Sequence, residues 1–328
     1  MGSRKPALES LEMNFKSANI LVTGGTGFIG SHLVEELLKK NANIFSTFLV
    51  TDPRSYFKTR KLDRKTVLLH QDVCDFESIF DVITKFNIDY IFHLAAQPLV
   101  ETAYHNPKQT LYTNILGTIN ILESARLYPK VRGIVVASSD KAYGKLDKEK
   151  YLEEDSLKGT HPYEVSKSAA DLITSSYFKT YNLPVVVTRF GNIYGEGDLN
   201  ESRIIPSILN SILKNETLEI RSDGKYVRDY LYVKDVVSGY LAVAADIDNL
   251  KGEAFNFGSS DTLSVMELVE TVEKILRKKI KYKIMNTAKN EIKYQSLDYS
   301  KIRNAAGWKP KSSVASTIKE IFKWYKSL

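Results

Sequence analysis

The stretch NILVTGGTGFIGSHLVEELLKK, residues 19–40, decides the fold of this 328-residue chain. A short apolar run meets three glycines spaced as G-x-x-G-x-x-G, and an amphipathic run follows directly. This order predicts a strand, a tight turn and a helix. The first glycine permits the turn, the second lets the backbone approach a pyrophosphate, and the third lets the helix pack closely on the strand. The stretch therefore predicts a dinucleotide site that includes Gly24, Gly27, Phe28, Ile29 and Gly30.

The same alternation of apolar runs and amphipathic runs continues to about residue 190. Strands alternating with helices over this length predict an α/β fold with a doubly wound, mostly parallel sheet of the Rossmann type. We expect the further strands at 44–51, 67–70, 90–94, 133–138 and 185–189, and the helices at 76–86, 110–127 and 162–181.

After Gly191 the pattern changes, because turn residues and charges interrupt the apolar runs. Shorter helices are expected at 204–213, 233–244, 265–277 and 313–326. This pattern of shorter elements predicts a smaller α/β C-terminal lobe over the open edge of the dinucleotide site. We expect residues 1–16 to be a tail outside the fold, disordered or vector-derived, 17–190 to bind the dinucleotide, and 191–328 to be mainly a substrate lobe, with room for the chain to cross back.

Charge and composition narrow the class of protein. The formal net charge is +7, which fits a solvated lysine-rich surface or attraction of an anionic substrate such as a nucleotide diphosphate. The basic residues are scattered, so no nucleic acid is expected as a partner, and no apolar run is long enough to span a membrane. Cys74 is the single cysteine, which suits a reducing cytoplasm. No residues have metal-ligand spacing, so no metal is predicted.

Asp52 is the candidate for choosing between the two nicotinamide dinucleotides. It ends the second expected strand about 20 residues beyond Gly30, where a carboxylate accepts hydrogen bonds from an adenosine ribose and disfavours a 2′-phosphate. This predicts NAD rather than NADP. Arg54 offers the alternative of neutralising such a phosphate, and Asp52 as a helix cap is a second alternative. We expect Asp72 and Val73 to border the adenine and Leu94, Ala95 and Ala96 to line the cofactor channel.

Two segments carry the candidate chemistry, ASSDKAYG at 137–144 and HPYEVSK at 161–167. Tyr163 and Lys167 are one helical turn apart and face the same side. Lys167 can bind the cofactor ribose and, with the nicotinamide charge, lower the pKa of Tyr163. Tyr163 would then be a base for a substrate hydroxyl, assisted by Ser139. A Tyr-x-x-x-Lys spacing alone is common in helices, so it gains meaning here only from the glycine turn and the preceding serine.

From about Asn19 to its end the chain resembles the extended short-chain dehydrogenase/reductase superfamily, in its nucleotide-sugar epimerase/dehydratase branch. The resemblance implies a homodimer through the helices at 110–127 and 162–181, although their apolar residues (Ile115, Ile119, Leu122, Ala169, Leu172, Ile173 and Tyr177) fit an internal core equally well. The matching blocks are GGTGFIG (24–30), HLAA (93–96), TNILGT (113–118), the two reacting segments, RFGNIYG (189–195), RDYLYVKDV (228–236), NFG (256–258) and GWKP (307–310).

Asp140 and Lys141 point to a subfamily. Epimerases of this branch have small neutral residues here, dTDP-glucose and GDP-mannose 4,6-dehydratases have Asp-Glu, and CDP-glucose 4,6-dehydratases are similar to this sequence with Asp-Lys. The stretch AQPLV (96–100) strengthens that likeness, whereas RDYLYV is more similar to epimerases and to dTDP- or UDP-sugar enzymes. The resemblance implies an NAD-dependent nucleotide-sugar 4,6-dehydratase of deoxysugar and surface-polysaccharide synthesis, with CDP-glucose favoured.

The resemblance also implies roles for single residues. Tyr163 with Ser139 would take the C4 hydroxyl proton, Asp140 would protonate the departing C6 oxygen, and Lys141 would be the C5 base. Alternatively Lys141 orders Asp140 or a water, or the pair is only a surface turn. The alternatives for the whole chain are a nucleotide-sugar 4-epimerase and a non-catalytic dinucleotide sensor. The remaining family-implied contacts are Asn114 for the cofactor and Gln97, Asn192, Arg203 and Arg228 for the nucleotide-diphosphate sugar, with surface salt bridges as the plain alternative for the two arginines.

Overall fold

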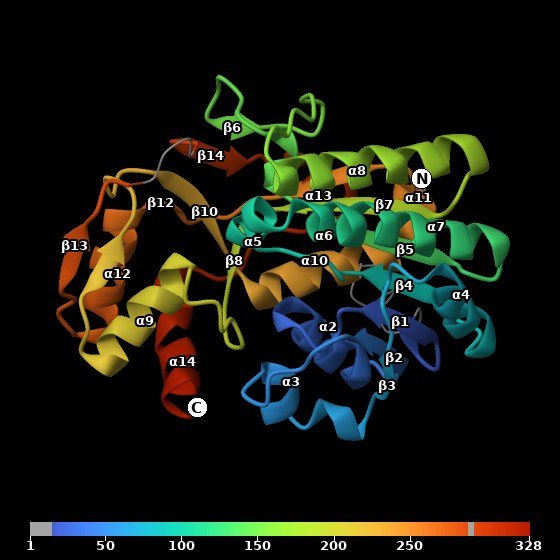
Figure 1. The fold of residues 1–328 in the computed structure, drawn as a ribbon, viewed down its shortest axis with the longest axis horizontal. Helices are drawn as coiled ribbons and strands as arrows, with labels where there is room; N and C mark the ends of the chain where they lie inside the picture. Colours follow the sequence, from blue (N-terminus) through green and yellow to red (C-terminus); the bar gives the residue numbers. More distant parts are fainter. Residues whose placement is uncertain (1–14, 288–291) are drawn as a thin grey trace.

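A seven-stranded parallel sheet forms the larger part of the molecule in the computed structural model, which describes residues 15–287 and 292–328 (Figure 1). The strand order is β11-β7-β5-β4-β1-β2-β3. The chain runs outward from β1 to β3 and then crosses to the other side of β1, so the order reverses between β1 and β4, where ligands bind in such sheets. The fold class is therefore confirmed. The strands are β1 Asn19–Thr23, β2 Asn43–Phe48, β3 Val67–His70, β4 Tyr90–His93, β5 Gly133–Ala137, β7 Val185–Phe190 and β11 Ala254–Phe257.

Helices cover both faces of this sheet, because their apolar stripes are buried against its valine- and isoleucine-rich strands. On one face α2 (Phe28–Lys39) packs against α10 (Val233–Ala245). On the other, α7 (Gly117–Leu127) lies between α4 (Phe76–Lys85) and α8 (Pro162–Tyr181). The smaller helices around the sheet are α3 Tyr56–Thr59, α5 Val100–His105, α6 Pro107–Leu111, α11 Ile247–Leu250 and α13 Ser300–Ala306.

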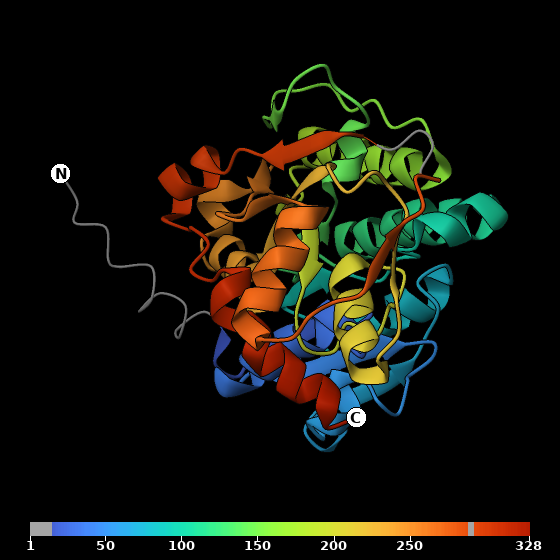
Figure 2. The ribbon, with the colours of Figure 1, turned by 90° about the vertical axis from the view of Figure 1, so that its left-hand side faces the viewer.

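A second lobe is built around a smaller sheet of order β12-β10-β14-β6, with β8 paired to β10. Three amphipathic helices enclose its core, α9 (Ile204–Lys214), α12 (Val265–Leu276) and α14 (Val314–Lys326), and Figure 2 faces them. The strands are β6 Lys150–Tyr151, β8 Asn192–Tyr194, β10 Val227–Tyr232, β12 Thr262–Ser264 and β14 Tyr294–Leu297, and β9 Leu218–Ile220 pairs separately with β13 Tyr282–Ile284.

The chain passes between the two sheets more than once. β6 precedes residue 190 yet pairs with β14 of the second sheet, and β11 follows residue 191 yet pairs with β7 of the first. The expected division at residue 190 thus agrees with the change in sequence pattern there, but these two strands pair across it. At the N-terminus, Phe15 is fully buried and packs edge-on against Tyr90, so the expected tail of 1–16 is wrong at its end. Residues 1–14 lie outside the described residues.

Two expected elements differ from the structure for local reasons. β2 ends at Phe48 rather than at 51, because Leu49 and Val50 are 52% and 85% exposed and have no neighbouring strand to cover them. The expected helix 110–127 begins earlier, with α6, and contains a π-helical turn at Tyr112–Leu116 before α7. Across the described residues no helix combines the length and apolar character that crossing a membrane requires.

Candidate active site

The glycine turn between β1 and α2 is as tight as its sequence predicts. Gly24 has φ +66°, and a Cβ there would lie 3.0 Å from the Cα of Ala95. A Cβ on Gly30 would lie 2.4 Å from the carbonyl oxygen of Gly24, so the start of α2 can approach β1 only without a side chain there. Neither an acidic residue in the first turn nor a capping side chain occupies this end of α2. The geometry suits a bound anion.

The end of β4 is fastened to this turn by hydrogen bonds. The backbone N–H groups of Leu94 and Ala95 both donate to Thr23 Oγ1 over 3.1 Å. His93 Nδ1 lies 2.9 Å from the same hydroxyl oxygen, and its Nε2 lies 3.2 Å from Thr118 Oγ1. Burial lowers the pKa of His93 to about 3, which favours the neutral ring between these two hydroxyl groups. Leu94 and Ala95 are thus fixed beside the glycine turn, and a cofactor channel lined by Leu94, Ala95 and the adjoining Ala96 stays a prediction.

Asp52 lies in the loop after β2 rather than at the end of that strand, which corrects the sequence-based placement. Its carboxylate accepts from Arg54 at three points, the backbone N–H at 2.8 Å, Nε at 3.2 Å and Nη2 at 2.9 Å. These hydrogen bonds lower the pKa of Asp52. The pair is exposed, and it brings the candidate ribose acceptor and the candidate phosphate partner into one contact.

Val73 and Asp72, the residues expected to border the adenine, are held by different contacts. Val73 is buried, its carbonyl accepts from Asn120 Nδ2, and a Cβ on Gly117 would lie 2.6 Å from Val73 Cγ2. The neighbouring Asp72 accepts from the N–H of Cys74.

Asn114 is buried on the π turn, and its side chain is engaged within the protein. Its Oδ1 accepts from the N–H of Gln97, while Nδ2 donates to the carbonyl of Gln97 and to Ser166 Oγ. The Gln97 side chain in turn accepts from Thr110. Asn114 therefore fixes the segment after β4 against α8, and sequence reasoning did not predict this positioning role.

The first reacting segment, residues 137–144, places Ser139 next to a buried acid. Ser139 caps a short 3₁₀ turn, Asp140–Tyr143, by accepting from the N–H of Lys141. Its hydroxyl donates to Asp140 Oδ1 over 3.0 Å. Asp140 is only 4% exposed, and its Oδ2 accepts from Lys141 Nζ over 2.9 Å. An acid, an amine and a hydroxyl therefore meet within three consecutive residues.

Tyr163 and Lys167 face this turn from α8. Burial raises the pKa of Tyr163 to about 12, against the lowering effects of a hydrogen bond with Ser139 and of the charge on Arg203. Lys167 Nζ donates to the carbonyl of Ala137 over 2.8 Å, and the lowering of the Tyr163 pKa by Lys167 together with a bound nicotinamide stays a prediction. Burial lowers the pKa of Lys167 to about 8, although Asp171 one turn further along α8 raises it.

Gln295 is a site residue that sequence reasoning missed. It lies on β14, is 1% exposed, and contacts both members of the Asp140–Lys141 pair. A lone glutamine between two strand residues carries no local signal, since only the pairing of β14 with β10 and β6 brings it to the turn.

The expected substrate residues lie on the second lobe or at its border. Asn192 begins β8, and Arg228 lies on β10, where its Nη1 donates to the carbonyl of Val227. Arg203, at the start of α9, is paired with the buried Asp198 over 3.0 Å, so the salt-bridge alternative is observed for this arginine. The positive charge of Arg203 also acts to lower the pKa of Tyr163, against the larger effect of burial.

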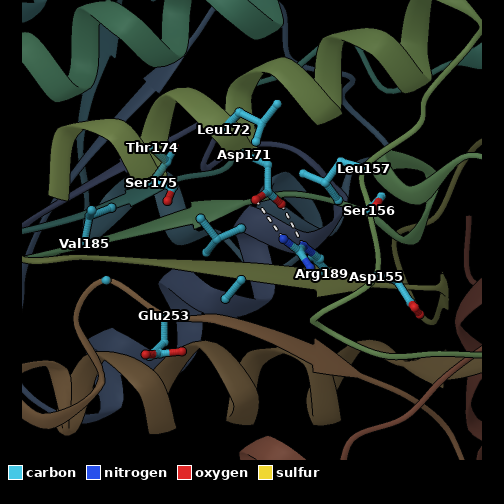
Figure 3. A pocket seen from close by; sticks show the side chains of 13 residues that line it. Asp155, Ser156, Leu157, Asp171, Leu172, Thr174, Ser175, Val185, Arg189 and Glu253 are labelled. Carbon is cyan, nitrogen blue, oxygen red and sulfur yellow. Dashed lines mark hydrogen bonds and ion pairs between the residues drawn. The ribbon is translucent and has the colours of Figure 1, made fainter. Parts of the chain in front are cut away.

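A pocket of about 260 Å³ lies behind the reacting turn, between α8, β7 and the edge strand β11 (Figure 3). None of the five candidate catalytic residues lines it. Its floor carries a buried ion pair in which Arg189 Nε and Nη2 donate to the two oxygens of Asp171 over 2.8 and 2.9 Å. Arg189 also donates to the hydroxyl of Tyr143, the last residue of the turn. The Asp171–Arg189 pair is therefore connected to the Asp140–Tyr143 turn through Tyr143.

Comparisons with known proteins match almost the whole chain. Residues 21–321 match the model of the family described as GDP-mannose 4,6 dehydratase. A CDP-glucose 4,6-dehydratase of Salmonella typhimurium is 30% identical, with 97% of this chain and 93% of the relative covered. The solved dTDP-glucose 4,6-dehydratase of Bacillus anthracis, in complex with NAD, is 29% identical with a TM-score of 0.83, covering 94% of this chain and 97% of its own. The UDP-glucose 4-epimerase of Thermotoga maritima, with UDP-glucose, is 30% identical with a TM-score of 0.85, covering 94% and 99%.

Proposed function

Because the chain belongs to the GDP-mannose 4,6-dehydratase family, we propose that it removes water from a nucleotide-diphosphate hexose to give the 4-keto-6-deoxy sugar nucleotide. The observation that carries this proposal is the buried Asp140, bonded to both Ser139 and Lys141 and facing Tyr163. A 4-epimerase needs no acid for a leaving oxygen, whereas a dehydratase does. We favour CDP-glucose as the substrate, since Asp-Lys at 140–141 resembles the CDP-glucose enzymes and a relative of that name aligns over almost the whole chain. Products of this kind feed deoxysugar and surface-polysaccharide synthesis.

The residues of the first lobe fit NAD. Side chains at Gly24 and Gly30 would fill the turn over which a pyrophosphate lies, and α2 presents its N-terminus there. Asp52 is the acceptor for the adenosine ribose, and Lys167 and Tyr163 reach the nicotinamide end of the same channel. When bound, NAD supplies a reversible acceptor for the hydrogen at C4, which makes C4 a ketone. Solved relatives hold NAD under a similar fold.

The protein's own groups then divide the proton transfers among them. Tyr163 takes the proton of the C4 hydroxyl, with Ser139 as its hydrogen-bond partner. The C4 ketone acidifies the hydrogen at C5. Asp140 gives a proton to the departing C6 oxygen, which leaves as water, while a base removes the C5 proton. Lys141 stands beside Asp140 either as that base or as the group that orients Asp140.

We assign the diphosphate and nucleotide to the second lobe. Asn192 offers an amide, and Arg228 and Arg203 offer guanidinium forks that suit phosphate oxygens. Arg203 would exchange Asp198 for the substrate, since that is the one carboxylate paired with it among the described residues. Gln97, beside the channel, would contact the sugar. The single cysteine suits the cytoplasm as its compartment.

We further propose a homodimer through the layer formed by α5 to α8. Leu172 on α8 is 59% exposed, and Tyr104 and Tyr112 of the same layer are more than half exposed. Leu122, one of the residues expected at this interface, lies instead in the core of the subunit, whereas Leu172 faces outward. A second copy would cover these side chains by a four-helix packing of α7 and α8.

A 4-epimerase is the second candidate, because an epimerase shares the fold at 30% identity. Mass spectrometry of products separates the two. The protein is incubated with the CDP, dTDP, UDP and GDP derivatives of glucose and no other reagent. A product lighter by one water from one donor supports the dehydratase and identifies the nucleotide. A product of unchanged mass that is the 4-epimer overturns it.

A further inference from the structure

Gln295 joins the acid–amine pair from a distant part of the chain. Its Nε2 donates to the carbonyl oxygen of Asp140 over 3.0 Å, and its Oε1 accepts from Lys141 Nζ over 2.5 Å. The strand that carries it, β14, pairs with β10 and β6 of the second sheet. Gln295 thereby connects the Asp140–Tyr143 turn, which follows β5 of the first sheet, to the lobe that we assign to the substrate.

The orientation of this carboxamide is dictated by its partners. A lysine ammonium can only donate, so the atom that faces Lys141 is the oxygen. A backbone carbonyl can only accept, so the atom that faces Asp140 is the nitrogen. Both contacts are satisfied only in this orientation, and because the side chain is 1% exposed, water is a poor substitute for either.

The consequence for Lys141 is that two acceptors hold its amine, Asp140 Oδ2 and Gln295 Oε1. These bonds hold the Lys141 amine against Oδ2 of Asp140, and Ser139 donates to the other carboxylate oxygen, Oδ1. The direction of the Asp140 carboxyl group is therefore set by a chain of contacts that ends in Gln295.

We propose that Gln295 is a positioning residue that orients Asp140 through Lys141 for the elimination of water, a role that rests on the dehydratase function proposed above. Gln295 also selects lysine at position 141. A glutamate there would place a carboxylate against Oε1, and turning the amide over would place Oε1 against the carbonyl of Asp140. One repulsive contact between acceptors results in either orientation.

The test uses Gln295→Met and Gln295→Glu in the full-length protein. Met removes both polar contacts at similar volume, whereas Glu keeps an acceptor for Lys141 and loses the donor to Asp140. In rapid-quench mass spectrometry with the substrate of the wild type, the 4-keto hexose formed before water loss should accumulate in both variants. Its formation should stay within a factor of about two, because Tyr163, Ser139 and Lys167 are untouched, while its loss of water slows by about 100-fold.

A second readout needs neither substrate nor cofactor. The labelling rate of Lys141 by an amine-acylating reagent, followed by peptide mass spectrometry, should rise in Gln295→Met, because the amine has lost one of its two acceptors. In Gln295→Glu it should not rise. Ser296→Ala is the matched control, because this buried neighbour on the same strand bonds Asp229 rather than the turn, and it should leave both readouts unchanged.

The outcomes separate this inference from the proposed function. If the wild type removes no water from any donor, the proposed function fails, and the labelling result still shows whether Gln295 holds Lys141. If the wild type removes water and both variants do so at its rate, the positioning role is wrong. Equal slowing of both steps also contradicts it, since that result indicates general damage to the site.

Discussion

Lys167 shows how one buried side chain sets a pH dependence. Burial lowers the pKa of Lys167 to about 8, although Asp171 opposes this shift. The charged form is the one that can support an ionised Tyr163, and it is lost as pH rises through about 8. The stability of the fold changes with pH in the opposite direction. The folded state disfavours the charged amine, so the unfolded state binds more protons between about pH 8 and the usual lysine pKa of about 10.4. The contribution of Lys167 to the free energy of unfolding therefore rises over this range of pH.

We expect kcat/KM for dehydration to fall above about pH 8, about tenfold for each further unit of pH. Lys167→Arg keeps its charge at these pH values, so its smaller activity should lack this alkaline decline. Initial rates of wild type and variant between pH 6 and 10 provide the measurement. A decline at the same pH in both proteins assigns it to another group.

Asp52 and Arg54 form a contact with a prediction for cofactor choice. The carboxylate engages the guanidinium at two points, so removing its charge releases Arg54 for a 2′-phosphate. Asp52→Asn should weaken NAD binding and strengthen NADP binding, each by roughly 10- to 100-fold, the range for hydrogen bonds to charged groups. Titration of both dinucleotides by calorimetry measures the ratio. Adding Arg54→Ala should abolish the gain for NADP, and an unchanged ratio in Asp52→Asn contradicts the assignment.

At the scale of elements, sequence reasoning predicted those helices and strands that are determined by the local sequence pattern. The glycine turn, the strands β1, β2, β3, β4, β5 and β7 and the helix α8 follow from apolar periodicity and turn residues, and Tyr163 and Lys167 share a face of α8 as their spacing predicts. The end of β2 did not follow, because apolar character extends to Val50 while strand pairing does not. The π turn that carries Asn114 did not follow either, because the apolar pattern of residues 110–127 is that of a regular helix, and the partners of Asn114, Gln97 and Ser166, lie outside this stretch.

The buried pair of Asp171 and Arg189 is the test case for element packing, since it links α8 to β7 and, through Tyr143, to the reacting turn. Both side chains are less than a tenth exposed. Arg189→Met leaves the Asp171 carboxylate buried without a partner and should lower the free energy of unfolding by about 3–5 kcal/mol. Urea denaturation measures this change. Asp171→Leu combined with Arg189→Met should recover much of the loss, and a double variant as unstable as the sum of the single ones contradicts this account.

At the scale of the whole molecule, the site lies between two sheets, and the chain contributes strands first to one sheet and then to the other, more than once. Asp140, Tyr163 and Lys167 come from the first lobe, and Gln295 and Arg228 come from the second. A change of texture after Gly191 predicts a second lobe but not the pairing of β6 with β14, which brings Gln295 to Lys141. Contacts between residues more than 150 positions apart have no periodicity to reveal them.

The exposed layer of α5 to α8 predicts a dimer, which one charged side chain should disrupt. Leu172→Glu places a carboxylate in the centre of the proposed interface, where its desolvation is costly. Sedimentation velocity at micromolar concentration should show a dimer for the wild type and a monomer for the variant. Lys214→Glu, on the exposed end of α9, is the control for an added charge and should remain dimeric. A monomeric wild type overturns the proposal.

The central claim is that the sugar is oxidised at C4, loses water across C5 and C6, and recovers the C4 hydrogen at C6. The most direct test is to supply the accepted nucleotide sugar with deuterium at C4 and locate the label in the product by NMR. The account predicts a 6-deoxy sugar with deuterium in its C6 methyl group and no label released to solvent. Deuterium retained at C4 of an epimerised sugar would contradict the account and leave Asp140 without the role of acid.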